Sequence, residues 1–311
     1  MYPIQRTSRS EFVPIRQLQY HVRQWGTPSP DAPPLVLVHG WMDVAASFQF
    51  VVDALSQDHW VIAPDWRGFG LTETPATDNF WFPDYLADLD FLLDHYVGDQ
   101  PVHLVGHSMG GHIATLYAGV RPERVRRLIN LEGFGMPASR SAQAPGRYAK
   151  WMDELKGLQR GEMELKPYDS LEAVAQRLIK TNPRLGSDQA HWLAQHWARA
   201  NAQGEWRILG HAGHKVVNAQ LFRVDEVQAI YQRISAPMLC VVASSDSLGG
   251  WWKGKYTLEE FKQRIAVVPQ VTHAVIQDAG HMLHHDQPQA LAELIESFLG
   301  YPDLSVFPGD F

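Results

Sequence analysis

A serine between glycines stands in the stretch Gly106-His-Ser-Met-Gly-Gly111, which fits the pattern G-x-S-x-G. The stretch follows a short apolar run and precedes a helical pattern, so Ser108 would lie in a tight turn between a strand and a helix. Glycines on either side let the neighbouring backbone approach without a Cβ clash, and a helix N-terminus favours developing negative charge. The pattern therefore predicts that Ser108 is a nucleophile.

A nucleophilic serine needs a base, and the base needs a carboxylate to orient it. His281 follows the last apolar run and can reach the serine from a loop, so we expect it to be the general base. Two carboxylates, Asp246 and Glu132, also follow apolar runs. We expect Asp246 to be the acid, because it follows the run before that of His281. Glu132 is the alternative. We place it second because it stands where the chain leaves for a helical segment, where a carboxylate has a structural use.

The developing oxyanion requires hydrogen-bond donors. His39-Gly-Trp41 follows another apolar run, and its glycine allows the next amide to turn toward the serine. We therefore expect the backbone N–H groups of Trp41 and Met109 to form the oxyanion hole.

Other histidines are spaced as candidate metal ligands. His284 and His285 follow His281 in an H-x-x-H-H pattern without a glutamate partner, which favours helix-entry or surface positions. His211 and His214 lie on a glycine-containing loop, where they need not converge. The sequence also lacks a phosphate loop and a dinucleotide fingerprint, so we expect neither a metal nor a cofactor.

The elements that position these residues alternate along the chain. Apolar runs lie at 34–40, 60–65, 102–106, 127–131, 237–242 and 272–276, and helical patterns lie at 48–55, 83–96, 112–120 and 288–299. Continuous apolar strands separated by helices predict a doubly wound, mostly parallel sheet. Residues 19–24 are expected to form an antiparallel edge strand.

The alternation stops between Gly135 and Ile234, where helical signals replace strand signals. We therefore expect residues 1–135 and 235–311 to form the core and residues 136–234 to form a helical lid. Trp192 and Trp197 are candidates to line an apolar pocket, although most tryptophans of the lid are expected to hold it on the core.

Composition excludes several classes of protein. Lys and Arg number 27 against 34 Asp and Glu, and this net charge of −7 gives no electrostatic reason to bind nucleic acid or anionic lipid. The single cysteine, Cys240, cannot form an internal disulfide, which suits a reducing compartment. No apolar stretch is long enough for a membrane span, and residues 1–12 lack the apolar core of a signal peptide. We expect a cytoplasmic protein.

These motifs together resemble those of the α/β-hydrolase fold superfamily, from about Phe12 to Gly300. The matching pieces are His39-Gly-Trp, Asp65-Trp-Arg-Gly-Phe-Gly70, Gly106-His-Ser-Met-Gly-Gly111 and Gly280-His281. The resemblance implies a mostly parallel sheet of about eight strands, flanked by helices, with the lid inserted between strands 6 and 7.

Within this superfamily the chain resembles the serine hydrolase-like group of esterases. The pieces are residues 39–48, Asn182-Pro-Arg-Leu185 and Ser245-Asp-Ser247, and the resemblance implies Ser108 as nucleophile, His281 as base and Asp246 as acid. We therefore expect a serine hydrolase that cleaves a small carboxylic ester with an apolar part. Alternatives on the same triad are acyl transfer, including perhydrolysis, and cleavage of carbon–carbon bonds. From another class, the scaffold suits a non-catalytic small-molecule receptor.

Overall fold

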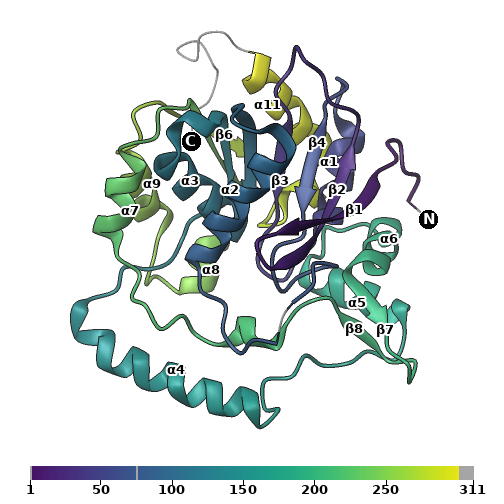
Figure 1. Cartoon of the computed structure of the whole chain (residues 1–311), viewed down its shortest axis with the longest axis vertical. Helices are drawn as coiled ribbons and strands as arrows, with labels where there is room; N and C mark the ends of the chain where they lie inside the picture. The colour runs from purple at the N-terminus through teal and green to yellow at the C-terminus, as the bar shows by residue number, and fades with distance from the viewer. Residues whose placement is uncertain (1, 75, 301–311) are drawn as a thin grey trace.

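The computed structural model describes residues 2–74 and 76–300. An eight-stranded sheet runs through its centre in the order β1-β2-β4-β3-β5-β6-β9-β10, with helices on both faces (Figure 1). The strands are β1 Arg9–Ile15, β2 Leu18–Trp25, β3 Leu35–Val38, β4 Val61–Pro64, β5 Val102–His107, β6 Val125–Leu131, β9 Met238–Ala243 and β10 Val271–Ile276. The first two strands pair antiparallel, β2 pairs antiparallel with β4, and the remaining pairs are parallel. The predicted α/β-hydrolase fold is therefore confirmed.

Two apolar layers sandwich the sheet, because successive side chains of a strand point to opposite faces. Val36 and Val38 of β3 join the layer that contains α2 and α3, whereas Leu35 and Leu37 join the layer that contains α1 and α11. Burial on both faces explains why these strands are continuously apolar in sequence. The helices of the two layers are α1 Gln49–Ala54, α2 Pro83–Val97, α3 Met109–Val120, α9 Leu258–Ile265 and α11 Pro288–Gly300.

The insertion leaves the sheet after β6 and returns at β9. It contains α4 Ala144–Gln159, α5 Leu171–Thr181, α6 Ser187–Trp197, the short strands β7 Ala198–Ala200 and β8 Trp206–Ile208, and α7 Val224–Tyr231. Ser170 caps α5 by accepting a hydrogen bond from the Ala173 amide at 3.1 Å. Helix α4 runs along the outside of the molecule at the bottom of Figure 1.

Two parts of the insertion pack directly on the core. Helices α5 and α6 form an apolar cluster with Val44, Ala46 and Phe50. The other part, α7, contributes Val227 and Tyr231 to the layer that contains α3. Helix α7 therefore belongs with the core in its packing, although its residues fall within the range predicted for the lid.

Shorter elements complete the described chain. They are the 3-10 turns Ala45–Phe48, Pro122–Arg124, Ser141–Gln143 and Ala212–Lys215, with α8 Ser247–Trp252 and α10 Leu283–Asp286. Across residues 2–74 and 76–300, the helices are all too short or too polar to cross a membrane.

Candidate active site

Ser108 stands between β5 and α3 with φ 53° and ψ −118°, a backbone conformation that residues other than glycine rarely adopt. Two glycines make this turn sterically possible. A Cβ on Gly106 would lie 2.3 Å from the Gly110 carbonyl oxygen, and one on Gly110 would lie 2.3 Å from the Val38 carbonyl oxygen. The serine amide donates to Leu131 O at 2.8 Å, which fixes the turn against the end of β6. The strained turn predicted from G-x-S-x-G is therefore present.

A carboxylate contacts the expected base. Glu132 follows β6 and is buried, and its Oε2 accepts a hydrogen bond from His281 Nδ1 at 2.8 Å. The same carboxylate accepts from the Ala243 amide at 2.8 Å and from the Ser247 hydroxyl at 2.5 Å. Three donors thus hold Glu132 in place, and the bond to Nδ1 leaves Nε2 of His281 as the nitrogen that can take up a proton.

The expected pairing of His281 with Asp246 is wrong for this structure. Asp246 is exposed and caps α8, where it accepts from the Gly249 amide at 2.8 Å. Glu132 reaches His281 instead because its side chain extends across the end of β9, the strand between β6 and β10. Glutamate has one more methylene than aspartate, which lengthens the reach of this side chain. Glu132 was the alternative acid in the sequence argument.

Two aromatic rings flank the imidazole of His281. Trp251 meets it edge-on with the ring centroids 4.1 Å apart, and its indole is 52% exposed. The centroid of the His107 ring lies 4.7 Å from that of His281, and His107 Nε2 donates to the His281 carbonyl oxygen at 2.7 Å. Burial holds the pKa of His107 well below its usual value, so this ring is neutral. His107 therefore ties the turn at Ser108 to the loop that carries His281.

The candidate oxyanion donors come from two segments that meet at Ser108. Met109 is the first residue of α3, so its amide has no acceptor within the helix. A Cβ on Gly40 would lie 3.1 Å from Ser108 Cβ, which brings the segment carrying Trp41 against the nucleophile. The Trp41 side chain is 52% exposed beside it.

Buried contacts that the sequence did not indicate hold the segment of Trp41. His39 Nδ1 donates to Gly40 O at 2.7 Å, and its Nε2 accepts from the Trp66 amide at 2.9 Å. Trp197 of the insertion donates through Nε1 to Met42 O at 3.0 Å. The other candidate pocket residue, Trp192, is 5% exposed and packs against Phe50, a contact that seats the insertion on the core.

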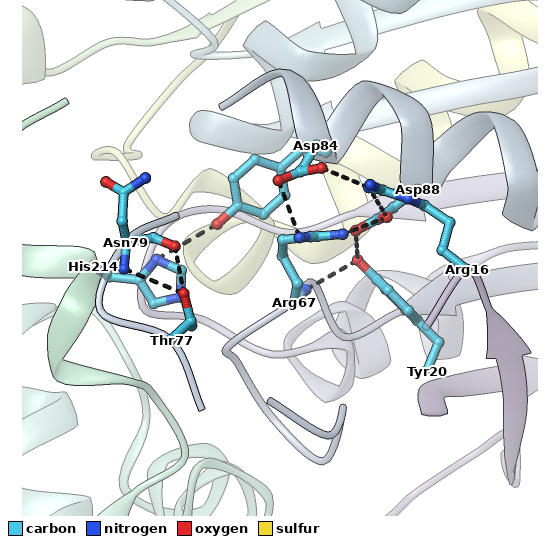
Figure 2. A network of polar contacts seen from close by, with 9 residues as sticks. Arg16, Tyr20, Arg67, Thr77, Asn79, Asp84, Asp88 and His214 are labelled. Carbon is cyan, nitrogen blue, oxygen red and sulfur yellow. Dashed lines mark hydrogen bonds and ion pairs between the residues drawn. The ribbon is translucent and has the colours of Figure 1, made fainter. Parts of the chain in front are cut away.

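The loop that follows β4 is fixed by ionic contacts (Figure 2). Arg67 donates to both carboxylate oxygens of Asp88, at 2.5 and 2.7 Å, and Tyr20 donates its hydroxyl proton to the same group at 2.7 Å. Arg16 reaches Asp88 and Asp84 from the turn after β1. Because Asp88 is fully buried, this paired charge locks the loop to α2.

A buried group of three residues has donors suited to a metal ion. The ligand atoms of Asp43, His107 and His284 lie within 4.8 Å of one another. One carboxylate and two imidazoles suit zinc-like cations, whereas a direct ion pair between Asp43 and His284, whose Oδ2 and Nε2 lie 3.7 Å apart, would use the same atoms. Burial alone would raise the pKa of Asp43, but the nearby imidazoles of His284, His285 and His39 lower it to about 2.

Local sequence patterns do not reveal this group, because Asp43 and His107 come from distant segments. His284 lies in α10, as a helix-entry residue would, but both His284 and His285 are buried and not on the surface. Ser47 Oγ contacts Nε2 of His284 at 3.1 Å and of His285 at 2.5 Å. In the other pair, His214 lies stacked between Phe69 and Phe80, with ring centroids 3.8 and 3.7 Å away, so it serves packing.

Known proteins of similar sequence or fold cover most of the chain. A family model described as the alpha/beta hydrolase fold matches residues 33–288. The serine hydrolase-like protein of Danio rerio is 24% identical over 309 residues, covering 94% of this chain and 89% of that protein. The 2-hydroxy-6-oxo-2,4-heptadienoate hydrolase of Pseudomonas putida is 38% identical over 106 residues, 33% of this chain and 38% of that protein. A thioesterase domain from the curacin biosynthetic pathway superposes with a TM-score of 0.79 at 26% identity, covering 94% of this chain and 99% of that one.

Proposed function

The chain belongs to the α/β-hydrolase fold family, and from this premise we propose that it is a serine hydrolase that cleaves a carboxylic ester through an acyl-enzyme. The observation that carries the proposal is the hydrogen bond of 2.8 Å between His281 Nδ1 and Glu132 Oε2. A buried carboxylate on Nδ1 orients the imidazole with Nε2 available, which is the arrangement a general base needs beside a nucleophilic serine.

The proposed triad is Ser108, His281 and Glu132. Nε2 of His281 takes the proton of Ser108 Oγ as the oxygen attacks the ester carbonyl carbon, and Glu132 stabilises the imidazolium. The amides of Trp41 and Met109 hold the oxyanion. The imidazolium then protonates the leaving alkoxide, and an acyl-serine remains. A water molecule deprotonated by His281 attacks that ester, and the acid is released while Ser108 recovers its proton.

We propose that the insertion, residues 136–234, acts as the lid and sets which ester is accepted. Its Trp197 bonds to the backbone of Met42, next to a candidate oxyanion donor. The exposed indoles of Trp41 and Trp251 lie beside the reacting groups and supply apolar surface, which favours a substrate with an apolar acyl or alcohol part.

A second candidate reaction is hydrolysis of a carbon–carbon bond on the same triad. The similarity to the heptadienoate hydrolase of Pseudomonas putida, 38% identity over 106 residues, favours it. Against it, the segment after His39-Gly40 reads Trp-Met-Asp-Val and lacks the Gly-Pro-Gly stretch that resemblance to such enzymes would imply. The ester reaction therefore stays the main proposal.

The test is turnover by the purified chain of esters and thioesters that differ in acyl length, beside a vinylogous 1,5-diketone as carbon–carbon substrate. Ester hydrolysis that disappears in Ser108→Ala and persists in the exposed variant Ser187→Ala supports the proposal. A fluorophosphonate should add its phosphonyl group to Ser108, as peptide mass spectrometry would detect. Labelling without turnover of any member of the panel would instead favour a receptor, and turnover of the diketone alone would favour the second reaction.

A further inference from the structure

A cavity of about 220 Å³ lies where the insertion meets β2, and its lining residues include no member of the proposed triad. It is smaller than the cavities of roughly 300–1,000 Å³ that hold drug-sized ligands. Its wall combines apolar residues with polar ones, and the polar residues are His21, Arg23, Asp65, Gln195, His196 and Arg199.

Arg23 brings a positive charge to this wall, and its hydrogen-bond partners are neutral groups. Its side chain is 8% exposed, and it donates to Ser8 Oγ at 2.7 Å and to His196 Nδ1 at 3.2 Å. Its Nε is buried and lacks a hydrogen-bond partner. Within residues 2–74 and 76–300, Arg23 forms no ion pair with a carboxylate. Burial lowers the pKa of Arg23, and the charge of Asp65 offsets this only in part, so a further anion at the guanidinium would stabilise its charged form.

Asp65, the carboxylate in the cavity wall, already accepts hydrogen bonds from other donors. Its oxygens accept from His21 Nδ1 at 2.7 Å, from the Ala45 amide at 2.7 Å and from the Leu71 amide at 2.8 Å. These three bonds tie the loop after β4 to β2 and to the turn Ala45–Phe48. They leave the guanidinium of Arg23 without an anionic acceptor.

The remaining donors of the cavity follow from the hydrogen bonds of its histidine. Burial lowers the pKa of His196 to about 4, so the ring is neutral near pH 7. Because its Nδ1 accepts from Arg23, the proton of the neutral ring resides on Nε2. The cavity wall therefore offers N–H donors from Arg23 and His196, and Arg199 adds an exposed guanidinium at the rim.

We propose that this cavity binds a small carboxylate, held by Arg23, His196 and Arg199. The guanidinium fork matches the two oxygens of a carboxylate, and charge-assisted bonds of this kind are about twice as strong as neutral ones. A bound carboxylate would neutralise the buried charge of Arg23. It would also link β2 to the segment running from α6 into β7, because these residues come from both.

The experiment is a titration of the full chain with trifluoroacetate, followed by ¹⁹F NMR at constant ionic strength, with acetate and inorganic phosphate as competitors. We expect one saturable site from which acetate displaces the probe. Displacement by phosphate but not by acetate would overturn the choice of a carboxylate. Ser108→Ala should bind the probe with unchanged Kd, because the site is separate from the nucleophile.

Three variants test the assignment. Arg23→Met keeps the aliphatic stem and should weaken binding by at least about tenfold, the equivalent of one charge-assisted hydrogen bond. Arg199→Met should weaken it as well, and because Arg199 is exposed this variant remains informative if Arg23→Met does not fold. Arg207→Met, on β8 and outside the cavity wall, is the matched control. Absence of saturable binding would overturn the proposal. So would an unchanged Kd in both single variants, Arg199→Met and Arg23→Met.

Discussion

Glu132 and His281 are 149 residues apart in the chain, yet their side chains share a hydrogen bond of 2.8 Å. Both ends of that bond are fixed independently. Glu132 Oε1 also accepts from the Ala243 amide, and the carbonyl of His281 accepts from His107. The pair therefore sets the orientation of the imidazole before any substrate binds, which is the condition for a positioned general base.

Replacing Glu132 by glutamine should lower kcat by roughly 10³–10⁴-fold, because an amide stabilises neither the required tautomer nor the imidazolium. Steady-state ester hydrolysis, with the fold checked by circular dichroism, measures the effect. Asp246→Asn is the matched control, since Asp246 contacts the Gly249 amide and not His281. We expect it to cost about 1 kcal/mol of stability at most, through the helix cap, and to leave kcat almost unchanged. An equal loss of kcat in both variants would contradict the assignment of the acid.

The backbone strain at Ser108 predicts a stability difference between two inactive variants. Alanine at φ 53° and ψ −118° keeps the strain of the serine, whereas glycine adopts this conformation readily. Ser108→Gly should therefore have a free energy of unfolding about 1 kcal/mol higher than that of Ser108→Ala, as measured by urea denaturation. Ser187→Ala and Ser187→Gly, at the first position of α6, provide the control, because there glycine should be the less stable of the two. Equal stability of the two Ser108 variants would show that the turn is relaxed.

The buried imidazole of His112 predicts acid sensitivity of the fold. Desolvation by burial, aided by the charge of Arg264, lowers its pKa to about 4. Between this pKa and the ordinary value of about 6.5, the unfolded chain binds a proton that the folded chain does not. The neutral ring therefore makes its full contribution to the free energy of unfolding above a pH of about 6.5. This contribution is lost as the pH falls toward about 4.

The measurement is the free energy of unfolding at about pH 7.5 and at about pH 5, where this single group accounts for a loss of about 2 kcal/mol. His112→Gln should reduce the loss by that amount. His95→Gln, on the exposed face of α2, controls for the substitution itself. If His112→Gln lost as much stability on acidification as the unaltered chain does, titration of His112 would not be the cause.

Local sequence patterns were sufficient for the nucleophile turn and for most of the sheet. G-x-S-x-G encodes its own strand, turn and helix, and β3 and β5 are apolar throughout because both their faces are buried. The first strand, β1, was missed because most of its residues are exposed and a proline, Pro14, interrupts its apolar residues. An edge strand of this kind is defined by its pairing with β2, which a local pattern does not contain.

The choice of acid depended on geometry at longer range. Both Asp246 and Glu132 follow strands, and what separates them is the turn after β9, which directs Asp246 to cap α8. The sequence pattern does not indicate the group of Asp43, His107 and His284 for the same reason. Three segments must fold together before their ligand atoms come close to one another. Residue type and spacing therefore indicated which side chains are candidates for chemistry, while the partner of each side chain depended on tertiary structure.

Trp197 links the insertion to the segment that carries a candidate oxyanion donor, and a point mutation can test the effect of this link. Its indole N–H donates to Met42 O at 3.0 Å, and Met42 follows the candidate oxyanion donor Trp41. Trp197→Phe keeps an aromatic ring and removes this bond, so the segment carrying the oxyanion donor loses one restraint of about 1 kcal/mol. We expect the rate of serine labelling by a small fluorophosphonate to fall roughly five- to tenfold, because the probe also develops negative charge at this position. Trp192→Phe, on the same helix but packed against Phe50, should lower thermal stability and leave the labelling rate unchanged. Equal labelling rates in both variants would assign Trp197 to packing alone.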